Sequence, residues 1–458
     1  MTIITTQAAE ATYRRDLGDG LVLRWSTAAD TENIAQLVSL VFRDKEDEPP
    51  NEPMSNEIRQ LMRGDHPLMG PGDFGVVEDT RKEENPIVAC TCLWRNHWEY
   101  EGIPFAMGQP EIVATNPEYR NRGLIRALFD MVHARSESEG HMVQAITGIP
   151  YFYRQFGYEY ALNLEGKRVT YVTLIPKAKE GEPEPYTLRN ATAEDIPLIQ
   201  ECYNRRRATS VVWTNIPDTC WLYEIQRRDD PRINKMPRLQ MIIDITNTVR
   251  GYTWLSARRR GNGSNFKVYA LDVLPGVNLH AMMPSVLRGI QAYAATVPTH
   301  GSDAAPVDEI SFNLGRTHPV YEALGNVLAP FYEAPYAWYV RVRNIPAFLR
   351  YIAPALEKRL ENSVVESYTG ELKIDMYRGG IHMVFEHGRL TAAEPWQLPI
   401  YNSNAGAGCP QLVFLQLLFG HRSLDELRYA FPDVWADRDA EILLKTLFPA
   451  KPSATLSL

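Results

Sequence analysis

The stretch that decides the fold reads Glu111-Ile-Val-Ala-Thr-Asn-Pro-Glu-Tyr-Arg-Asn-Arg-Gly-Leu-Ile-Arg126. Its apolar start at 112–115 predicts a buried strand, and Pro117 ends that strand because proline cannot donate to a sheet ladder. A basic turn containing Gly123 follows. Apolar residues then recur with the spacing of one helical face, at Leu124, Ile125, Leu128, Met131 and Val132. The sequence therefore predicts a strand, a tight turn and a helix.

The turn has the chemistry of a phosphate-binding site. A helix N-terminus presents unpaired backbone N–H groups and the positive end of the helix dipole, and a glycine lets a ligand approach the backbone closely. Arg120, Arg122 and Arg126 add fixed positive charge. A diphosphate would suit this turn, although an ordinary solvated basic turn accounts for the same residues equally well.

The same residues resemble the acetyl-CoA-binding signature of the GNAT acetyltransferases. Arg120-x-x-Gly123, preceded by Val113-Ala-Thr-x-Pro-x-Tyr119, follows the family pattern Gln/Arg-x-x-Gly-x-Gly/Ala except at the last position, where Ile125 stands. That departure is similar to the Eis-like (enhanced intracellular survival) branch, which favours Arg-Gly-Leu-Leu/Ile there. The resemblance implies acetyl-CoA as co-substrate. The cofactor-binding residues that it implies are Val113, Ala114, Thr115, Arg120, Asn121, Arg122, Gly123, Leu124, Ile125 and Arg126.

An internal repeat predicts two copies of one αβ domain. Leu23-Arg-Trp-Ser-Thr-Ala-Ala-Asp30 is echoed by Leu188-Arg-Asn-Ala-Thr-Ala-Glu-Asp195, and each is a strand end followed by Thr-x-x-Asp, which resembles a capping box that opens a helix. Where the first copy has its basic turn, the second reads Leu274-Pro-Gly-Val-Asn-Leu-His-Ala281. We therefore expect the second copy to lack the cofactor site and to serve as scaffold and as a wall of the substrate pocket.

We expect an α+β fold in three domains, because 458 residues are too many for one core. A charged, proline-rich segment at 176–185 marks a linker, and after about residue 344 a helix from Pro346 to about Leu360, several strands and a helix capped by Ser423 follow. This last pattern resembles the sterol-carrier-protein-like C-terminal domain of the Eis-like proteins. The predicted domains are a catalytic GNAT domain at 1–180, a degenerate GNAT-like domain at 186–344 and a sterol-carrier-protein-like domain at 345–458.

A second motif, Pro150-Tyr-Phe-Tyr-Arg-Gln-Phe-Gly-Tyr158, is similar to the Phe-Tyr-x-x-Phe-Gly-Tyr/Phe signature that closes a GNAT active site. The resemblance implies that Tyr153 is the general acid that protonates the departing thiolate, and a tyrosine pKa of about 10 suits that task. An aromatic core cluster is the alternative interpretation. The resemblance also implies that the C-terminal carboxylate, here that of Leu458, accepts the amine proton. Glu111 is the competing base, acting through a water.

Composition argues against several other classes of protein. With 48 Lys and Arg against 56 Asp and Glu, the net charge is −8, which disfavours general nucleic-acid binding. We expect no signal peptide and no membrane-spanning segment. The five cysteines are sparse and odd in number, which suits a reducing cytoplasm. We also expect no metal site, because His382 and His387 fall on opposite faces of a predicted strand.

Together these observations predict a cytoplasmic, acetyl-CoA-dependent N-acetyltransferase in which a primary amine attacks the thioester directly. The acceptor would be a small-molecule amine, for which the resemblance implies a broad, polyamine-like or aminoglycoside-like class. The resemblance also implies a homo-oligomer, with no nucleic-acid or membrane partner. Two alternatives stay open: a non-catalytic carrier whose third domain binds a lipid, and a protein that senses acyl-CoA without turnover.

Overall fold

The computed structural model describes residues 7–43, 45, 47–206, 209–227, 238–259, 262–297, 305–397 and 405–456. The chain divides into two compact units. Unit 1 comprises Met1–Leu162, Thr209–Asn215 and Ala337–Leu458, and unit 2 comprises Asn163–Ala208 and Ile216–Tyr336. Three sheets and their helices confirm the predicted α+β class. The domain boundaries near 180 and 344 stay a prediction.

Unit 1 is built on a nine-stranded sheet with the order β1-β2-β3-β4-β5-β6-β16-β7, and β10 pairs with β4 off this path. Its strands are β1 (Arg14–Gly18), β2 (Leu21–Trp25), β3 (Phe74–Asp79), β4 (Ile87–Tyr100), β5 (Ile103–Thr115), β6 (Val143–Ile146), β7 (Glu159–Leu164), β10 (Val212–Thr214) and β16 (Tyr336–Val342). Strands β1 to β5 are antiparallel neighbours, whereas β5 and β6 run parallel. A helical crossover must therefore join β5 to β6.

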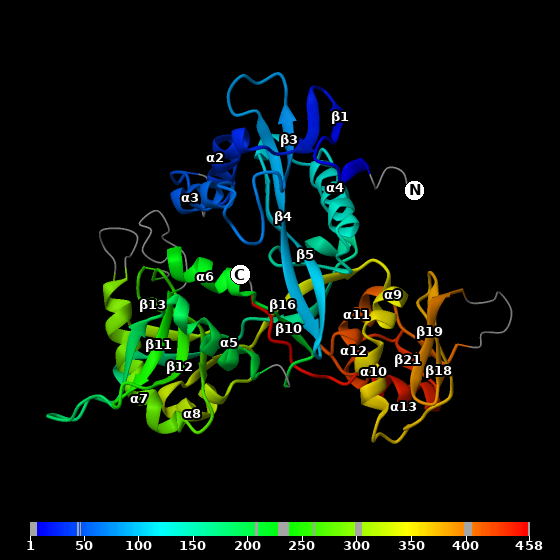
Figure 1. The fold of residues 1–458 in the computed structure, drawn as a ribbon. Coiled ribbons are helices and arrows are strands. Elements are labelled where there is room, and N and C mark those ends of the chain that lie inside the picture. The colour runs from blue at the N-terminus through cyan, green and yellow to red at the C-terminus, as the bar shows by residue number, and fades with distance from the viewer. Residues whose placement is uncertain are drawn as a thin grey trace. The chain divides into compact units, whose positions relative to one another are not determined.

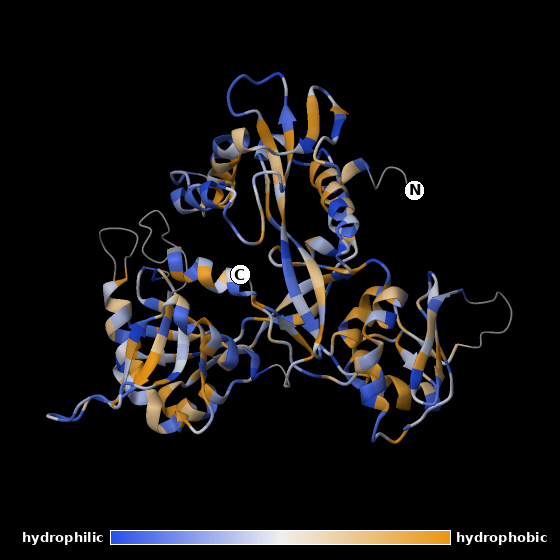
Figure 2. Cartoon of the chain, viewed as in Figure 1, coloured by the Kyte–Doolittle hydropathy of each residue, from blue (hydrophilic) through white to orange (hydrophobic). Residues whose placement is uncertain are grey.

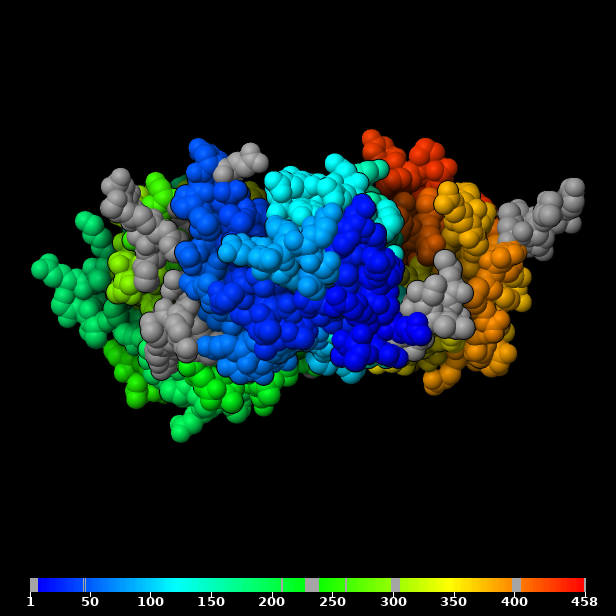
Figure 3. Space-filling model, turned by 90° about the horizontal axis from the view of Figure 1, so that it is seen from above, coloured from blue at the N-terminus to red at the C-terminus, as the bar shows by residue number. Residues whose placement is uncertain are grey.

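The helices of this region are η1 (Ala28–Asp30), α2 (Thr31–Val41), α3 (Glu52–Leu61), η2 (Pro117–Tyr119), α4 (Leu124–Ser138) and η3 (Phe152–Phe156). Helix α4 is the crossover, and its apolar face packs on buried residues of β2 and β3, which confirms the predicted strand, turn and helix. Figure 1 shows α2 and α3 on one side of β3 and β4, and α4 on the other side. Hydrophobic residues occur on both the strands and the helices here (Figure 2). Seen from above, the blue-to-cyan N-terminal part of the unit presents one continuous surface (Figure 3).

The C-terminal part of unit 1 carries a five-stranded sheet with the order β19-β18-β17-β20-β21. Its elements are α9 (Ile345–Tyr351), α10 (Ala353–Leu360), β17 (Gly370–Asp375), β18 (Gly380–Glu386), β19 (Arg389–Trp396), β20 (Ala407–Gly408), α11 (Gln411–Leu418), α12 (Leu424–Ala430), β21 (Trp435–Ala436) and α13 (Arg438–Leu447). The single helix predicted from Pro346 to Leu360 is two helices, since Pro354 lacks the N–H that would continue α9. Ser423 caps α12 as predicted.

Unit 2 repeats the topology of the first sheet, with the strand order β15-β8-β14-β13-β12-β11-β9. Its elements are β8 (Lys167–Tyr171), η4 (Val172–Leu174), β9 (Tyr186–Asn190), η5 (Ala193–Asp195), α5 (Ile196–Asn204), α6 (Asp218–Arg227), β11 (Arg238–Asp244), β12 (Val249–Leu255), β13 (Asn265–Val273), α7 (Leu279–Thr296), β14 (Glu309–Phe312), α8 (Pro319–Leu328) and β15 (Phe331–Glu333). Here β13 and β14 form the parallel pair, and α7 is the crossover.

The two copies begin in the same way, as the repeat predicts. Thr27 and Asp30 form a capping box whose carboxylate also binds Arg24 at 2.7 Å, and Thr192 and Asp195 do the same with Arg189, again at 2.7 Å. None of the helices within the described residues has the length and apolar character that crossing a bilayer requires.

Candidate active site

Strand β5 is interrupted by a bulge just before the predicted cofactor residues. The register with β4 shifts between Cys90 and Cys92, whose partners are Ala114 and Glu111. Ile112 absorbs the extra residue with a φ of 54°. That conformation is costly for a β-branched side chain and persists only where the surroundings enforce it. The bulge re-aims the side chains on either side of it, Glu111 among them.

Beyond a short contact, β5 and β6 diverge. Met107 and Gly108 pair with Val143 and Gln144, whereas the described pairings of residues 109–115 are to β4 alone. One edge of β5 is therefore open over the segment that carries Val113, Ala114 and Thr115. An open strand edge offers backbone N–H and C=O groups to an extended ligand.

The turn that leads into α4 is shaped for an anion. Gly123 is the N-cap in the left-handed region, with a φ of 72°, and it supplies no side-chain cap to the helix. Nothing lies within 4 Å of the position that a Cβ on Gly123 would take. Arg120, Arg122 and Arg126 are exposed around it. The first N–H groups of α4 thus face an open, positively charged surface.

We call the divergence of β5 from β6 the splay. Tyr153 lies in an aromatic cluster that includes Ile146 of β6 and contacts Val113 of β5. Its side chain is 3% exposed, and its ring lies 5.7 Å from that of Phe129 and 5.3 Å from that of Tyr339. Burial raises the pKa of the Tyr153 hydroxyl well above 10, and the nearby Glu111 carboxylate raises it further. The structure thus shows the packed aromatic ring of the alternative interpretation. The raised pKa makes the hydroxyl a weaker acid than a tyrosine with the ordinary pKa of about 10, and the general-acid role stays a prediction. Tyr151 does not join the cluster, since it is 73% exposed.

Glu111 is held by hydrogen bonds at the mouth of the splay. Its carboxylate accepts from the Gln109 amide at 2.9 Å and from Thr147, which follows β6. Burial raises the pKa of Glu111 to about 7, and the charge of Glu57 on α3 adds to the effect. A carboxylate with a pKa near neutrality can take up and release protons at physiological pH.

The last described residues lie along β10 as an added strand. Val211 N–H donates to Pro452 at 2.8 Å, Ala454 N–H donates to Val212 at 2.9 Å, and Leu456 N–H donates to the Thr214 hydroxyl at 2.9 Å. Because β10 is antiparallel to β4, this tail runs from the tip of the β4–β5 hairpin back towards its bulged part. Leu458, the predicted base, lies outside the described residues.

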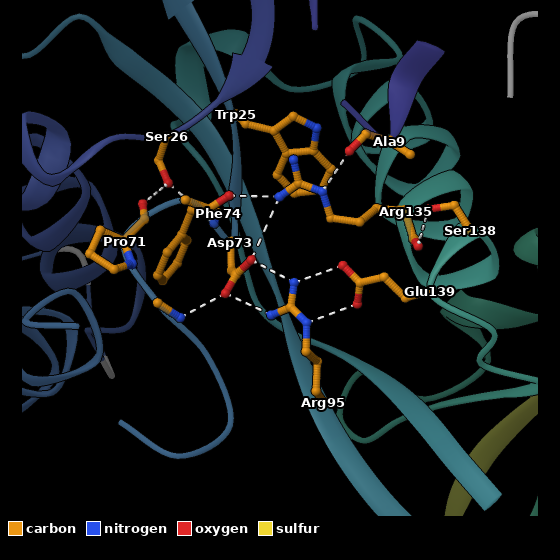
Figure 4. Close-up of polar contacts among 12 residues, drawn as sticks. Ala9, Trp25, Ser26, Pro71, Asp73, Phe74, Arg95, Arg135, Ser138 and Glu139 are labelled. Carbon is orange, nitrogen blue, oxygen red and sulfur yellow. Dashed lines mark hydrogen bonds and ion pairs between the residues drawn. The ribbon is translucent and has the colours of Figure 1, made fainter. Parts of the chain in front are cut away.

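An ion network with Asp73 and Arg135 buried at its centre fixes the loop that borders β4 (Figure 4). Asp73 binds Arg95 at 2.7 Å and lies 3.6 Å from Arg135, whose guanidinium stacks over Trp25 at 3.3 Å. Arg95 also binds Glu139 at 2.8 Å. The network ties the loop before β3 to β4 and α4, and so stiffens the sheet on which the candidate site is built.

Sequence reasoning did not single out Gln109, Asn96 or Thr147. Gln109 precedes Glu111 by two residues, so the alternation of a strand could have placed both side chains on one face. No pattern announces Thr147, because only the fold brings the end of β6 to Glu111. Within the described residues there is no group of three or more His, Cys, Asp or Glu side chains that could hold a metal ion.

Comparison with known proteins identifies the class of the first copy. Residues 23–161 match the family model described as an acetyltransferase (GNAT) domain. Those residues contain the open strand, the basic turn and Tyr153. A search of curated protein sequences finds no match.

Solved structures share the fold along nearly the whole chain. A GCN5-related N-acetyltransferase from Kribbella flavida aligns with a TM-score of 0.62 at 17% identity, covering 97% of this chain and 98% of that one. A GCN5-related N-acetyltransferase from Anabaena variabilis aligns with a TM-score of 0.62 at 13% identity, covering 94% and 98%. Eis1 from Mycobacterium abscessus aligns with a TM-score of 0.57 at 13% identity, covering 96% and 100%. The chain therefore has a GNAT fold, with the architecture of these three proteins.

Proposed function

We propose that this chain is an acetyl-CoA-dependent N-acetyltransferase that transfers the acetyl group to a primary amine by direct attack. The observation that carries the proposal is the splay of β5 from β6, with a basic turn at one end and Tyr153 beside Glu111 at the other. The GNAT domain match over the same residues and the architecture shared with N-acetyltransferases support it.

The co-substrate would lie along the open edge of β5. The backbone N–H groups of 121–126 and the side chains of Arg120, Arg122 and Arg126 would bind the pyrophosphate. Backbone groups of Val113, Ala114 and Thr115 would hold the pantetheine arm and polarise the thioester oxygen. Positioning two reactants in this way supplies much of the rate enhancement expected of a transferase.

The chemistry then needs one acid and one base. The amine nitrogen bonds to the thioester carbon, the C–S bond breaks, and the thiolate that leaves takes a proton from Tyr153. The proton that the amine loses goes to a carboxylate. Leu458 and Glu111 are the two candidates: the described tail leads towards the site, and Glu111 already lies beside Tyr153.

The acceptor class is the one that the family resemblance implies, and the charge around Glu111 supports it. Glu57 and Glu111 both place negative charge at the site, which suits an amine that arrives as a cation. We therefore infer a small-molecule amine acceptor, of polyamine-like or aminoglycoside-like character. We also propose that the protein is located in the cytoplasm, that it forms a homo-oligomer, and that its C-terminal domain is sterol-carrier-protein-like.

Titration calorimetry with acetyl-CoA, followed by a thiol-release assay on a panel of amines, tests the proposal. We expect binding by the wild type, its loss in an Arg122→Glu/Gly123→Glu variant, and thiol release with at least one amine. A Lys82→Glu variant is the matched control. Lys82 Nζ lies 6.0 Å from the centre of the Tyr119 ring, so the variant reverses a charge near the turn without altering the turn itself. A folded wild type that binds no acetyl-CoA would refute the proposal, and binding without turnover on any amine would favour a sensor.

A further inference from the structure

Two buried amides stand behind Glu111 in a line. The Asn96 side-chain N–H donates to the Gln109 carbonyl oxygen at 2.6 Å, and the Gln109 N–H donates to Glu111 Oε1 at 2.9 Å. Asn96 is 3% exposed and Gln109 is 1% exposed. Both lie on the long β4–β5 ribbon, next to the bulge. Burying polar groups this deeply is costly unless they are hydrogen-bonded. The two amide nitrogens meet this requirement, whereas Asn96 Oδ1 has no hydrogen-bond partner within the described residues.

The line has a fixed direction. An ionised carboxylate only accepts hydrogen bonds, so the NH₂ of Gln109 faces Glu111, and the Gln109 carbonyl oxygen is left to accept from Asn96. If the Gln109 amide alone were rotated by 180°, its NH₂ would face the NH₂ of Asn96, and its carbonyl oxygen would face the carboxylate oxygen of Glu111. Both contacts would be repulsive. Gln109 is therefore a donor towards the ionised Glu111 carboxylate, and a donor stabilises the ionised form of a carboxylate.

The other titratable groups around Glu111 either raise its pKa or are neutral. Glu57 on α3 adds negative charge, Tyr153 on η3 is a neutral phenol, and Cys92 on β4 is a buried neutral thiol. Thr147 adds one more hydrogen bond to the carboxylate. Among the described residues, the charged group that acts on Glu111 is the carboxylate of Glu57, so the hydrogen bonds from Gln109, the Ile112 backbone and Thr147 are what offset the burial of Glu111.

We propose that Gln109 is a positioning residue for acetyl transfer: its amide, whose carbonyl oxygen accepts from Asn96, donates to the Glu111 carboxylate and keeps it aimed at the acceptor amine. This inference rests on the proposed function, with Glu111 receiving the amine proton. Gln109 itself touches no reacting atom.

A Gln109→Leu variant tests this, because leucine fills a similar volume without a donor. A hydrogen bond to a charged group is worth about 1.5 kcal/mol, which moves a pKa by about one unit. In the pH profile of kcat/KM, we call the part where the value falls as the pH decreases the acidic limb. We expect the midpoint of this limb to shift upward by about one pH unit in Gln109→Leu. Turnover at pH 7 should then fall about fivefold and should recover above pH 9. The KM for acetyl-CoA should stay within twofold, since the co-substrate turn is untouched.

Glu111→Gln is the reference variant, and it should abolish the acidic limb. A folded Gln109→Leu protein whose limb coincides with that of the wild type would overturn the inference, as would a limb that survives in Glu111→Gln. If Gln109→Leu does not fold, the Asn96→Ala variant provides the test. Removing the hydrogen bond from Asn96 to Gln109 should move the midpoint of the acidic limb in the same direction by a smaller amount. A wild type without turnover would instead refute the proposed function, whereas an unmoved limb in an active enzyme refutes only the role of Gln109.

Discussion

Acidification should loosen helix α8 of unit 2 through one histidine. His318 is the N-cap of α8, and its Nδ1 accepts the Val320 N–H at 3.1 Å. The ring is 6% exposed, and burial lowers its pKa from 6.5 to about 4, although Asp272 lies 3.5 Å from Nε2. A protonated ring has two donors and no acceptor, so charging His318 removes the cap.

The size of the effect follows from linkage. A group whose pKa is depressed on folding contributes stability above its unfolded pKa, and that stability is lost as the pH falls. For His318, with values of 6.5 and about 4, the loss is about 1 kcal/mol between pH 7 and pH 5.5 and about 3 kcal/mol by pH 4. Glu224 works against this, since burial raises its pKa to about 8 and unit 2 gains stability when that carboxylate is protonated.

The test must therefore be a difference between two proteins. Asparagine is a strong N-cap that does not titrate, so a His318→Asn variant keeps the cap and loses the pH dependence. Hydrogen exchange of the 319–328 amides, corrected for intrinsic rates, should show the wild type losing about 1 kcal/mol more than His318→Asn between pH 7 and pH 5.5. A difference that stays constant over this range would refute the reasoning, because Glu224 is common to both proteins.

Three further predictions concern unit 1. Tyr153→Phe should lower kcat by about 100-fold with little change in acetyl-CoA affinity, because general acid catalysis is worth that much; unchanged turnover would remove Tyr153 as the acid. Deleting Leu458 should reduce kcat if its carboxylate is the base. Steady-state kinetics of this deletion and of Glu111→Gln, measured side by side, identify the base as the residue whose change removes the acidic limb. Arg135→Leu should cost about 2–4 kcal/mol in urea unfolding, since Asp73, Ala9 and Gly72 each lose a buried partner, and a loss below about 0.5 kcal/mol would contradict the role of the network.

The local motifs were predictable because their physics is local. Pro117 ends a strand wherever it stands, Gly123 supplies a left-handed cap, and the Thr27 and Asp30 spacing closes a capping box without help from the rest of the chain. The break of α9 at Ile352 was also readable, since Pro354 stands inside the predicted helix.

Long-range partners were not predictable in the same way. Strand β16 enters the first sheet beside β6 from almost two hundred residues along the chain, and Tyr339 on it packs against Tyr153. The segment 209–215 likewise leaves the surrounding chain to pair with β4 as β10. Strand pairing of this kind is decided by which edges are left unpaired in the folded sheet, and single-sequence periodicity carries no record of that.

The two copies show why a motif alone does not establish chemistry. The second copy retains Pro319-Val-Tyr321-Glu-Ala-Leu-Gly325, with a tyrosine four residues before a glycine, as Tyr153 stands before Gly157. The Tyr321 hydroxyl, however, accepts from Leu314 N–H at 3.0 Å and can donate to Phe312 at 2.9 Å, so backbone groups at the end of β14 take up its hydrogen-bonding capacity. Tyr153 instead has a carboxylate of tunable charge beside it and a strand edge open in front. The same side chain thus closes a loop in one copy and packs among Phe129, Ile146 and Tyr339 in the other, so the spacing of the motif alone does not fix the surroundings of its tyrosine.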